Sequence, residues 1–219
     1  MAPTLRTRPG RLIVMEGLDG VGKTTQAQLL AANLRRRGWP VVLTQEPTAG
    51  PFGQRIRQLR RGRRQEVTPR EELALFLADR REHVQQVILP ALAAGKIVIA
   101  DRYYYSSMAY QGALGLDPGE IAAQHDRFAP EPDLVILLEL SPGERNRRLA
   151  QRGTAPDSFE EAGYLAKVKA IYDRLHLPQL CRIDASGSET EVQARILAQV
   201  LQCLNQVEVN PADQGERVP

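Results

Sequence analysis

Short, almost purely apolar segments alternate with longer amphipathic ones along the chain. The apolar segments predict strands at residues 12–15, 41–43, 97–100, 134–140 and 182–184. The amphipathic segments predict helices at residues 23–37, 69–90, 118–128, 159–175 and 189–204, with one more starting at Pro142. Because strands that alternate with helices form a parallel sheet covered on both faces, the pattern predicts an α/β fold with five parallel strands.

Two of the predicted helices have clear boundaries. In the helix at 23–37 the apolar residues recur at i, i+3, i+4 and i+7, and Gly38 ends it as a C-cap glycine. The helix at 69–90 has Thr68 as its N-cap, with Glu71 completing a capping box. Pro90 is expected to bend or end this second helix, because proline has no backbone N–H to donate.

Length and composition narrow the class of protein. The 219 residues suit a single domain, expected at 11–205, and 42% of them are apolar, which is enough for a full core. Residues 1–10 and 208–219 have no apolar period, so we expect flexible tails there. The net charge of +3 is too balanced to indicate a nucleic-acid-binding protein. The longest apolar run, 134–138, is too short to cross a membrane and no signal peptide is visible, so we expect a cytoplasmic protein.

One loop carries a phosphate-binding motif. Residues 17–24, GLDGVGKT, match G-x-x-x-x-G-K-[ST] directly between the first strand and the first helix. Glycines allow a tight turn whose N–H groups bind anionic oxygens, Lys23 adds a charge for the β- and γ-phosphates, and Thr24 offers a hydroxyl to Mg²⁺. The motif predicts a P-loop NTPase fold, but does not separate a kinase from a GTPase or an ATPase. The predicted nucleotide-binding residues are Gly17, Leu18, Asp19, Gly20, Val21, Gly22, Lys23 and Thr24.

A second set of motifs follows other strands. Glu46-Pro47 comes after the second strand, and Asp101-Arg102-Tyr103 comes after the third and leads into residues 106–112, SSMAYQG. Ligands of open α/β sheets bind at this carboxyl edge. Phe76 and Arg80 lie four residues apart on the intervening helix, so they share one face. Phe76 alone would more often be a core residue, whereas Arg80 beside an apolar face needs a partner for its charge.

The order of GLDGVGKT, EP, F-x-x-x-R and DRY-x-x-SS-x-AYQG resembles the bacterial branch of the thymidylate kinase family. The block from DRY to AYQG is the most specific part, because general P-loop proteins lack it. The resemblance covers about residues 12–204. It implies transfer of the γ-phosphate of ATP to thymidine 5′-monophosphate (dTMP), with Mg²⁺, to give the diphosphate dTDP. It also implies a homodimer.

The resemblance assigns roles to individual residues. Arg80 and Arg102 would hold the acceptor phosphate, a role that suits the fork geometry of arginine. The implied base and sugar contacts are Phe76 stacking on thymine, Ser107 and Gln111 at the base edge, and Tyr110 at the sugar, with Glu46 also on the acceptor side. The implied metal ligands are Thr24, Asp19 and Glu160, and Asp19 would also contact the acceptor.

Residues 146–159 resemble the mobile lid of nucleotide kinases, with a basic helix end followed by a small, polar loop. In this family a catalytic arginine comes either from the P-loop or from the lid, and here Gly20 follows Asp19 where a P-loop arginine would stand. The lid is therefore expected to supply it, with Arg152 as first choice and Arg148 as second. The implied catalytic residues are then Asp19, Lys23, Arg102 and Arg152. A solvated basic helix face is the competing interpretation of the lid arginines.

The chain departs from the family pattern at two positions. Ser158 follows the lid aspartate, and Gln45 precedes Glu46, where the family often has arginine at both places. A separate basic stretch, residues 55–64, contains six arginines. We interpret it as a solvated helix and loop that attracts anionic substrates, because no aromatic residues are interleaved as a nucleic-acid site would favour.

Two alternative functions stay open on the sequence. One is a kinase for another nucleoside or nucleotide, and the other is a P-loop NTPase that acts as a switch or a binding module. The second finds little support, because the chain has no guanine-reading N-K-x-D motif and carries a full set of acceptor motifs instead.

Overall fold

The computed structural model describes residues 10–60, 67–151 and 159–205. Its strands are β1 (Arg11–Glu16), β2 (Val41–Gln45), β3 (Ile97–Asp101), β4 (Leu134–Glu139) and β5 (Leu180–Asp184). They form one parallel sheet in the order β2-β3-β1-β4-β5, which confirms the predicted five-stranded fold. The tails expected at 1–10 and 208–219 lie outside the described residues, apart from Gly10.

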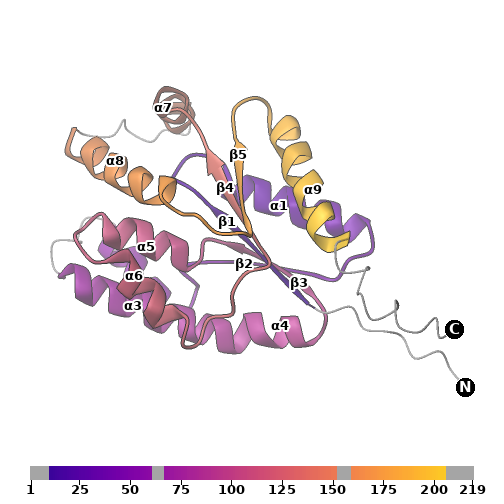
Figure 1. The fold of residues 1–219 in the computed structure, drawn as a ribbon, viewed down its shortest axis with the longest axis horizontal. Helices are drawn as coiled ribbons and strands as arrows, with labels where there is room; N and C mark the ends of the chain where they lie inside the picture. Colours follow the sequence, from indigo (N-terminus) through magenta and orange to yellow (C-terminus); the bar gives the residue numbers. More distant parts are fainter. Residues whose placement is uncertain (1–9, 61–66, 152–158, 206–219) are drawn as a thin grey trace, which may run out of the picture.

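The helices surround this sheet. They are α1 (Lys23–Arg36), α2 (Pro51–Gln58), α3 (Pro69–His83), α4 (Leu89–Ala93), α5 (Tyr104–Gly112), α6 (Pro118–His125), α7 (Pro142–Gln151), α8 (Phe159–Asp173) and α9 (Glu189–Asn205). Figure 1 shows α1 and α9 on one side of the sheet and α3, α4, α5, α6 and α8 on the other. Within the described ranges, none of the helices combines the length and the apolarity that a membrane span requires.

The sheet is buried on both faces because its strands send alternate side chains to opposite sides. On β1, Ile13 and Met15 pack with the apolar faces of α1 and α9, whereas Leu12 and Val14 pack with residues of α4, α5 and α8. The i, i+3, i+4, i+7 stripe predicted on α1 is fully buried in the first of these clusters. The carboxyl ends of β1, β2 and β3 are thereby held side by side, and the loops that follow them form the site.

The helix predicted at 69–90 is regular only up to His83. Its capping box is present: the Thr68 hydroxyl accepts a hydrogen bond from the Glu71 N–H at 3.2 Å, and the Glu71 carboxylate accepts from the Thr68 N–H at 2.7 Å. A π-helical turn (η3, Val84–Ile88) then precedes α4, which has Pro90 in its first turn. The helical backbone thus continues through Pro90 to Ala93 and does not end there as expected. What changes is the helix type, because a proline ring crowds the carbonyl four residues earlier.

Helix α5 was not predicted, although its residues were recognised as a motif. Tyrosine and serine are only moderate helix formers, so the segment has no strong local signal. Its N-cap residue, Tyr103, provides no side-chain cap. Instead the Glu16 carboxylate, at the end of β1, accepts hydrogen bonds from the N–H groups of Tyr103 at 2.9 Å and Ser106 at 3.1 Å. The helix therefore starts where a distant strand supplies the acceptor that its own sequence lacks.

Truncating a buried leucine of α1 tests the packing of this helix against the sheet. Leu30 has 0% exposure and lies in the core, whereas its neighbour Leu29 is only half-buried and outside both clusters. We expect Leu30→Ala to lower the free energy of unfolding by about 2–5 kcal/mol, because it leaves a cavity. Leu29→Ala, the matched control, should cost about 1 kcal/mol. Urea denaturation measures both, and equal losses would contradict the assigned packing.

Candidate active site

The loop after β1 has a backbone that only glycine adopts easily. Gly17, Gly20 and Gly22 have φ angles of 134°, 87° and 104°. A Cβ atom at Gly17 would lie 2.5 Å from the backbone oxygen of Leu138, and one at Gly20 would lie 2.9 Å from the side chain of Leu149. The motif therefore requires glycine both for its left-handed turns and for close contact with β4 and α7.

Lys23 lies at the first position of α1, inside this loop. Its ammonium group donates hydrogen bonds to the backbone oxygens of Gly17 at 2.9 Å and Leu18 at 2.7 Å. Burial and the nearby positive charge of Arg102 lower the pKa of Lys23 to about 8, against the opposing effect of three surrounding carboxylates. A phosphate bound here would raise this pKa again, because a nearby anion favours the charged form of the lysine.

A cavity of about 370 Å³ opens in front of Lys23. Its walls come from the P-loop, the ends of β2 and β3, and α2 with the residues after it. Three arginines line it in addition to Lys23: Arg57, Arg60 and Arg102. The basic stretch thus contributes directly to the site, a role that sequence reasoning did not assign to Arg57 and Arg60 individually. Its signal was the density of arginine, which identifies an anion-attracting segment but not which side chains turn inward.

Arg102 is held in one position at the centre of the site. Its guanidinium donates hydrogen bonds to the Asp19 carboxylate at 2.6 Å and to the Ser106 hydroxyl at 2.7 Å, and lies 5.0 Å from the centroid of the Tyr110 ring. Burial opposes ionisation of Asp19, but the charges of Arg102, Lys23 and Arg60 outweigh it and hold the pKa of Asp19 below its usual range. Arg102 also has a φ of 76°, a left-handed conformation that is typical of functional sites when it occurs outside glycine.

Two oxygen-bearing side chains meet beside the P-loop. The Thr24 hydroxyl donates a hydrogen bond to the Asp101 carboxylate at 2.5 Å, and both residues line the 370 Å³ cavity. Oxygen ligands of this kind are the ones that Mg²⁺ prefers. This contact makes Asp101 a candidate site residue, which sequence reasoning missed. Its position at a strand end in the DRY motif was a usable signal. Across the described residues, no cluster of three or more histidine, cysteine or acidic side chains could hold a metal, and the side chain of Glu160 is not among those described.

A second, narrow cleft of about 20 Å³ lies between α3 and α5. It brings together five of the predicted acceptor residues: Phe76, Arg102, Ser107, Tyr110 and Gln111. Phe76 is only half-buried and belongs to neither core cluster, so its position favours a ligand contact over a packing role. Pro47, Arg60 and Arg102 line both this cleft and the phosphate cavity, so the two are neighbours with a common wall.

Gln111 is the most informative residue of the cleft. It is 1% exposed, and its amide nitrogen donates a hydrogen bond to the Glu72 carboxylate at 3.4 Å. Its amide oxygen, Oε1, has no hydrogen-bond partner among the described residues. Buried polar atoms are almost always satisfied, so Oε1 of Gln111 is a candidate acceptor for a donor group of a ligand in the cleft.

Arg80 is placed differently from Arg102 and lines neither cavity. Its guanidinium pairs with the Glu46 carboxylate, at 2.7 Å from Nε and 2.6 Å from Nη2, and donates to the Ser107 hydroxyl at 3.0 Å. It also contacts Nε2 of His125, whose Nδ1 bonds the Ile121 carbonyl. Burial and the charge of Arg80 lower the pKa of His125 to about 3, so this histidine is neutral and accepts from Arg80. The structure thus places Arg80 behind the wall of the cleft, where Ser107 covers it, whereas its partner Glu46 lines the phosphate cavity.

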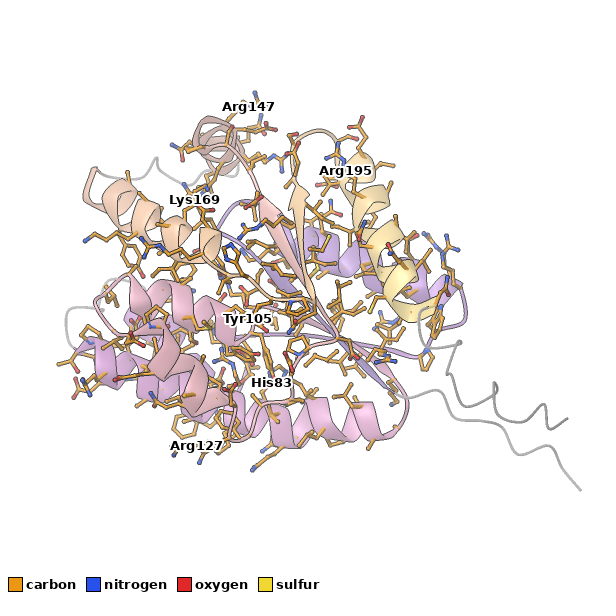
Figure 2. The ribbon with its side chains drawn as sticks, viewed as in Figure 1. His83, Tyr105, Arg127, Arg147, Lys169 and Arg195 are labelled. Carbon is orange, nitrogen blue, oxygen red and sulfur yellow. The ribbon has the colours of Figure 1, made fainter. Side chains whose placement is uncertain are left out.

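His83 completes this wall on the side of the sheet. Its Nδ1 lies 2.9 Å from the Glu46 carboxylate and its Nε2 lies 2.6 Å from the Thr44 hydroxyl. Figure 2 shows His83 and Tyr105 among the interior side chains between the sheet and the helices beside it. Sequence reasoning missed both His83 and His125, because a single histidine on a helix gives no signal of the charge it will meet.

The described part of the expected lid is the end of α7. Arg148 donates to the carbonyls of Ala185 at 2.9 Å and Gly187 at 3.2 Å, and lines a third cavity of about 360 Å³ that shares Gly22 and Thr25 with the phosphate cavity. Arg145, which was not predicted, donates to the backbone oxygen of Asp19 at 2.7 Å. Arg152 and Ser158 lie outside the described residues.

Comparison with known proteins agrees with this geometry. A sequence model of the family described as thymidylate kinase matches residues 15–196. The chain is 50% identical over 201 residues to a thymidylate kinase of Desulfotalea psychrophila, covering 91% of this chain and 98% of the relative. It is 45% identical over 202 residues to one of Xanthomonas campestris pv. campestris, covering 92% and 88%, and 45% identical over 189 residues to one of Akkermansia muciniphila, covering 86% and 90%. Matches over nearly the full length of the relatives show that the chain belongs to the thymidylate kinase family.

Proposed function

We propose that this chain is a nucleoside-monophosphate kinase that transfers the γ-phosphate of ATP to dTMP and releases ADP and dTDP. The observation that carries the proposal is the wall that the phosphate cavity shares with the narrow cleft between α3 and α5. A phosphate-binding cavity with four cationic side chains adjoins a cleft that has an aromatic ring and a buried, unpaired amide oxygen. A nucleoside monophosphate has this same sequence of parts, an anionic end joined to a flat base with a hydrogen-bonding edge.

The donor nucleotide occupies the other end of the phosphate cavity in this proposal. The P-loop amides and Lys23 bind its phosphates, as the helix N-terminus favours. The cavity of about 360 Å³ beside Arg148 receives the rest of ATP, because it shares Gly22 and Thr25 with the phosphate cavity. A P-loop that acts only as a switch would have no use for the separate acceptor cleft.

The acceptor is read by several side chains in the cleft. The ring of Phe76 offers a face to the base, and Oε1 of Gln111 accepts from the N3–H of thymine. Tyr110 excludes a 2′-hydroxyl from the sugar. Arg102 holds the 5′-phosphate. Arg57 and Arg60 supply the positive charge that is absent at Gln45, where the family often has arginine. The base displaces the Arg60 side chain, which is 37% exposed and therefore moves at small cost.

The reaction needs positioning and charge more than covalent chemistry. An oxygen of the acceptor phosphate attacks the γ-phosphorus, the bond from that phosphorus to the bridging β-oxygen breaks, and ADP leaves with the electron pair. Lys23 and Arg102 stabilise the charge spread over the transferred group. Thr24 and Asp101 are the side chains that would hold Mg²⁺, and the family resemblance adds Asp19 and Glu160 as further ligands. A bound Mg²⁺ would supply positive charge that neutralises the charge developing on the phosphate oxygens.

Other parts of the proposal rest on family resemblance. Residues 146–159 act as a lid over the phosphates, and Arg152 from this segment reaches the transferred group. The domain spans 11–205, and the protein acts as a homodimer in the cytoplasm.

The sharpest test of the activity is an acceptor panel. We expect dTMP to be the best substrate, with deoxyuridine monophosphate slower by about 10–200-fold, because one methyl group is read only by packing. Uridine monophosphate should be slower still, because it adds an unpaired hydroxyl against Tyr110, and deoxycytidine monophosphate (dCMP) should be poor. Steady-state kcat/KM values at fixed ATP, measured by coupled ADP release, give the order. A best rate with uridine or cytidine monophosphate would overturn the dTMP assignment.

The depressed pKa of Lys23 predicts proton uptake when ATP binds. At pH 8.5 the free lysine, with a pKa of about 8, is mostly neutral, and bound phosphates raise its pKa so that it takes up most of one proton. At pH 7 the lysine is already charged and takes up little. Titration calorimetry in buffers of different ionisation enthalpy measures the uptake. Lys23→Arg is the matched control, because arginine stays charged at both pH values, and the same uptake in both proteins would refute the assignment.

The lid proposal predicts a different kinetic effect for each of three neighbouring arginines. We expect Arg152→Ala to lower kcat by about 10³-fold or more, as a transition-state arginine does. Arg148→Ala should chiefly raise the KM for ATP, because this side chain is held by carbonyl groups at the donor cavity. Arg147→Ala is the control and should change the kinetics little, since the Arg147 side chain is 67% exposed. Figure 2 shows this residue on the outer side of α7. If neither Arg152→Ala nor Arg148→Ala changes the kinetics, the proposal that this segment supplies a catalytic arginine is wrong.

A further inference from the structure

Glu72 is a buried acid in the wall of the acceptor cleft. It lies in the first turn of α3, is 2% exposed, and lines the cleft together with Phe76 and Gln111. Its neighbour Glu71 is exposed and completes the capping box, so Glu72 is not needed for that purpose. Carboxylates are seldom fully buried because desolvation is costly. The contact of Glu72 within the cleft is therefore of interest.

The position of Glu72 determines which way the Gln111 amide points. Oε2 of Glu72 accepts a hydrogen bond from Nε2 of Gln111 at 3.4 Å, and Oε1 of Gln111 is left without a partner in the described part of the chain. If the amide were reversed, its oxygen would face the carboxylate, and two acceptors would meet in a buried place. An ionised carboxylate only accepts hydrogen bonds, so it excludes the reversed amide.

This orientation has a consequence for the base that the cleft accepts. The free edge of Gln111 is an acceptor, which matches the N3–H donor of a thymine or uracil ring. Cytosine has an unprotonated N3 that is itself an acceptor, so it would face Oε1 without a hydrogen bond. We propose that Glu72 is a positioning residue for acceptor specificity, which selects against cytosine nucleotides by fixing the amide of Gln111. This inference rests on the proposed function, because it concerns the base of the same acceptor.

The substitution Glu72→Gln would remove the constraint with little change in shape. The amide that it introduces can either accept or donate, so this new amide and the amide of Gln111 could reverse together and present Nε2 of Gln111 to the base. Nε2 is a donor and suits N3 of cytosine. A purely structural role for Glu72, such as a favourable acid in the first turn of α3, predicts a different result. It would lower turnover of both acceptors by the same factor and leave their ratio unchanged.

The experiment compares kcat/KM for dTMP and dCMP in wild type and Glu72→Gln, with radiolabelled ATP so that slow dCMP turnover is measurable. We expect the preference for dTMP to fall by about tenfold or more, because one buried hydrogen bond no longer has a fixed direction. Glu71→Gln is the matched control, with the same chemical change one residue earlier on an exposed side chain, and should keep the wild-type ratio. An unchanged ratio in Glu72→Gln would overturn the inference.

Two further variants make the result decisive. In a Gln111→Met background Glu72→Gln should no longer alter the ratio, because the amide through which it acts is gone, and a persisting effect would count against the proposal. If Glu72→Gln does not fold, Glu72→Asp replaces it. The shorter acid withdraws from Nε2 and should also lower the ratio, and a retained wild-type ratio would overturn the inference. Failure of the wild type to phosphorylate dTMP would instead refute the proposed function.

Discussion

A buried carboxylate at the end of β1 joins the three parts from which the site is built. Glu16 has 0% exposure and accepts hydrogen bonds from the backbone of Tyr103 and Ser106, from the Ser106 hydroxyl at 2.6 Å, and from the Tyr172 hydroxyl at 2.9 Å. Burial raises the pKa of Glu16, while Arg102 and these hydrogen bonds act in the opposite direction. Strand β1, which leads into the P-loop, and helices α5 and α8 are thus held together by one acid, and the spacing between the P-loop and the cleft depends on it.

Charge pairing sets the second constraint. Lys23, Arg57, Arg60 and Arg102 line one cavity, and four cations could not lie so close together without anions nearby. Asp19 pairs with Arg102 and, at 3.5 Å, with Arg60, so two of the four cations already have an ion-pair partner before substrate arrives. Substrate phosphates can then replace part of this pairing, which makes the cations available without first removing them from water. The arrangement fits a reaction in which two polyanions must approach each other.

Buried ion pairs and hydrogen bonds fix the orientation of polar side chains in and behind the cleft. Arg80 is surrounded by Glu46, Ser107 and His125, so its orientation is determined before any ligand binds. Gln111 is oriented in the same way by Glu72. Such preorganised walls reduce the cost of ordering the site on binding. In both cases a buried acid, Glu46 or Glu72, fixes the orientation of the side chain that it contacts.

The sequence by itself determined the sheet, the P-loop, the capping box before α3 and the family, because apolar periodicity, glycine turns and caps are local features that a few neighbouring residues specify. It also identified most of the residues that line the phosphate cavity and the cleft. Only the tertiary structure decided that α5 begins at a cap supplied by Glu16, that Arg80 turns into the wall, and that Asp101 faces Thr24. It also decided which way the Gln111 amide points. Each of these depends on a hydrogen bond or ion pair between elements far apart in the chain, and its partner is set by packing that no local pattern encodes.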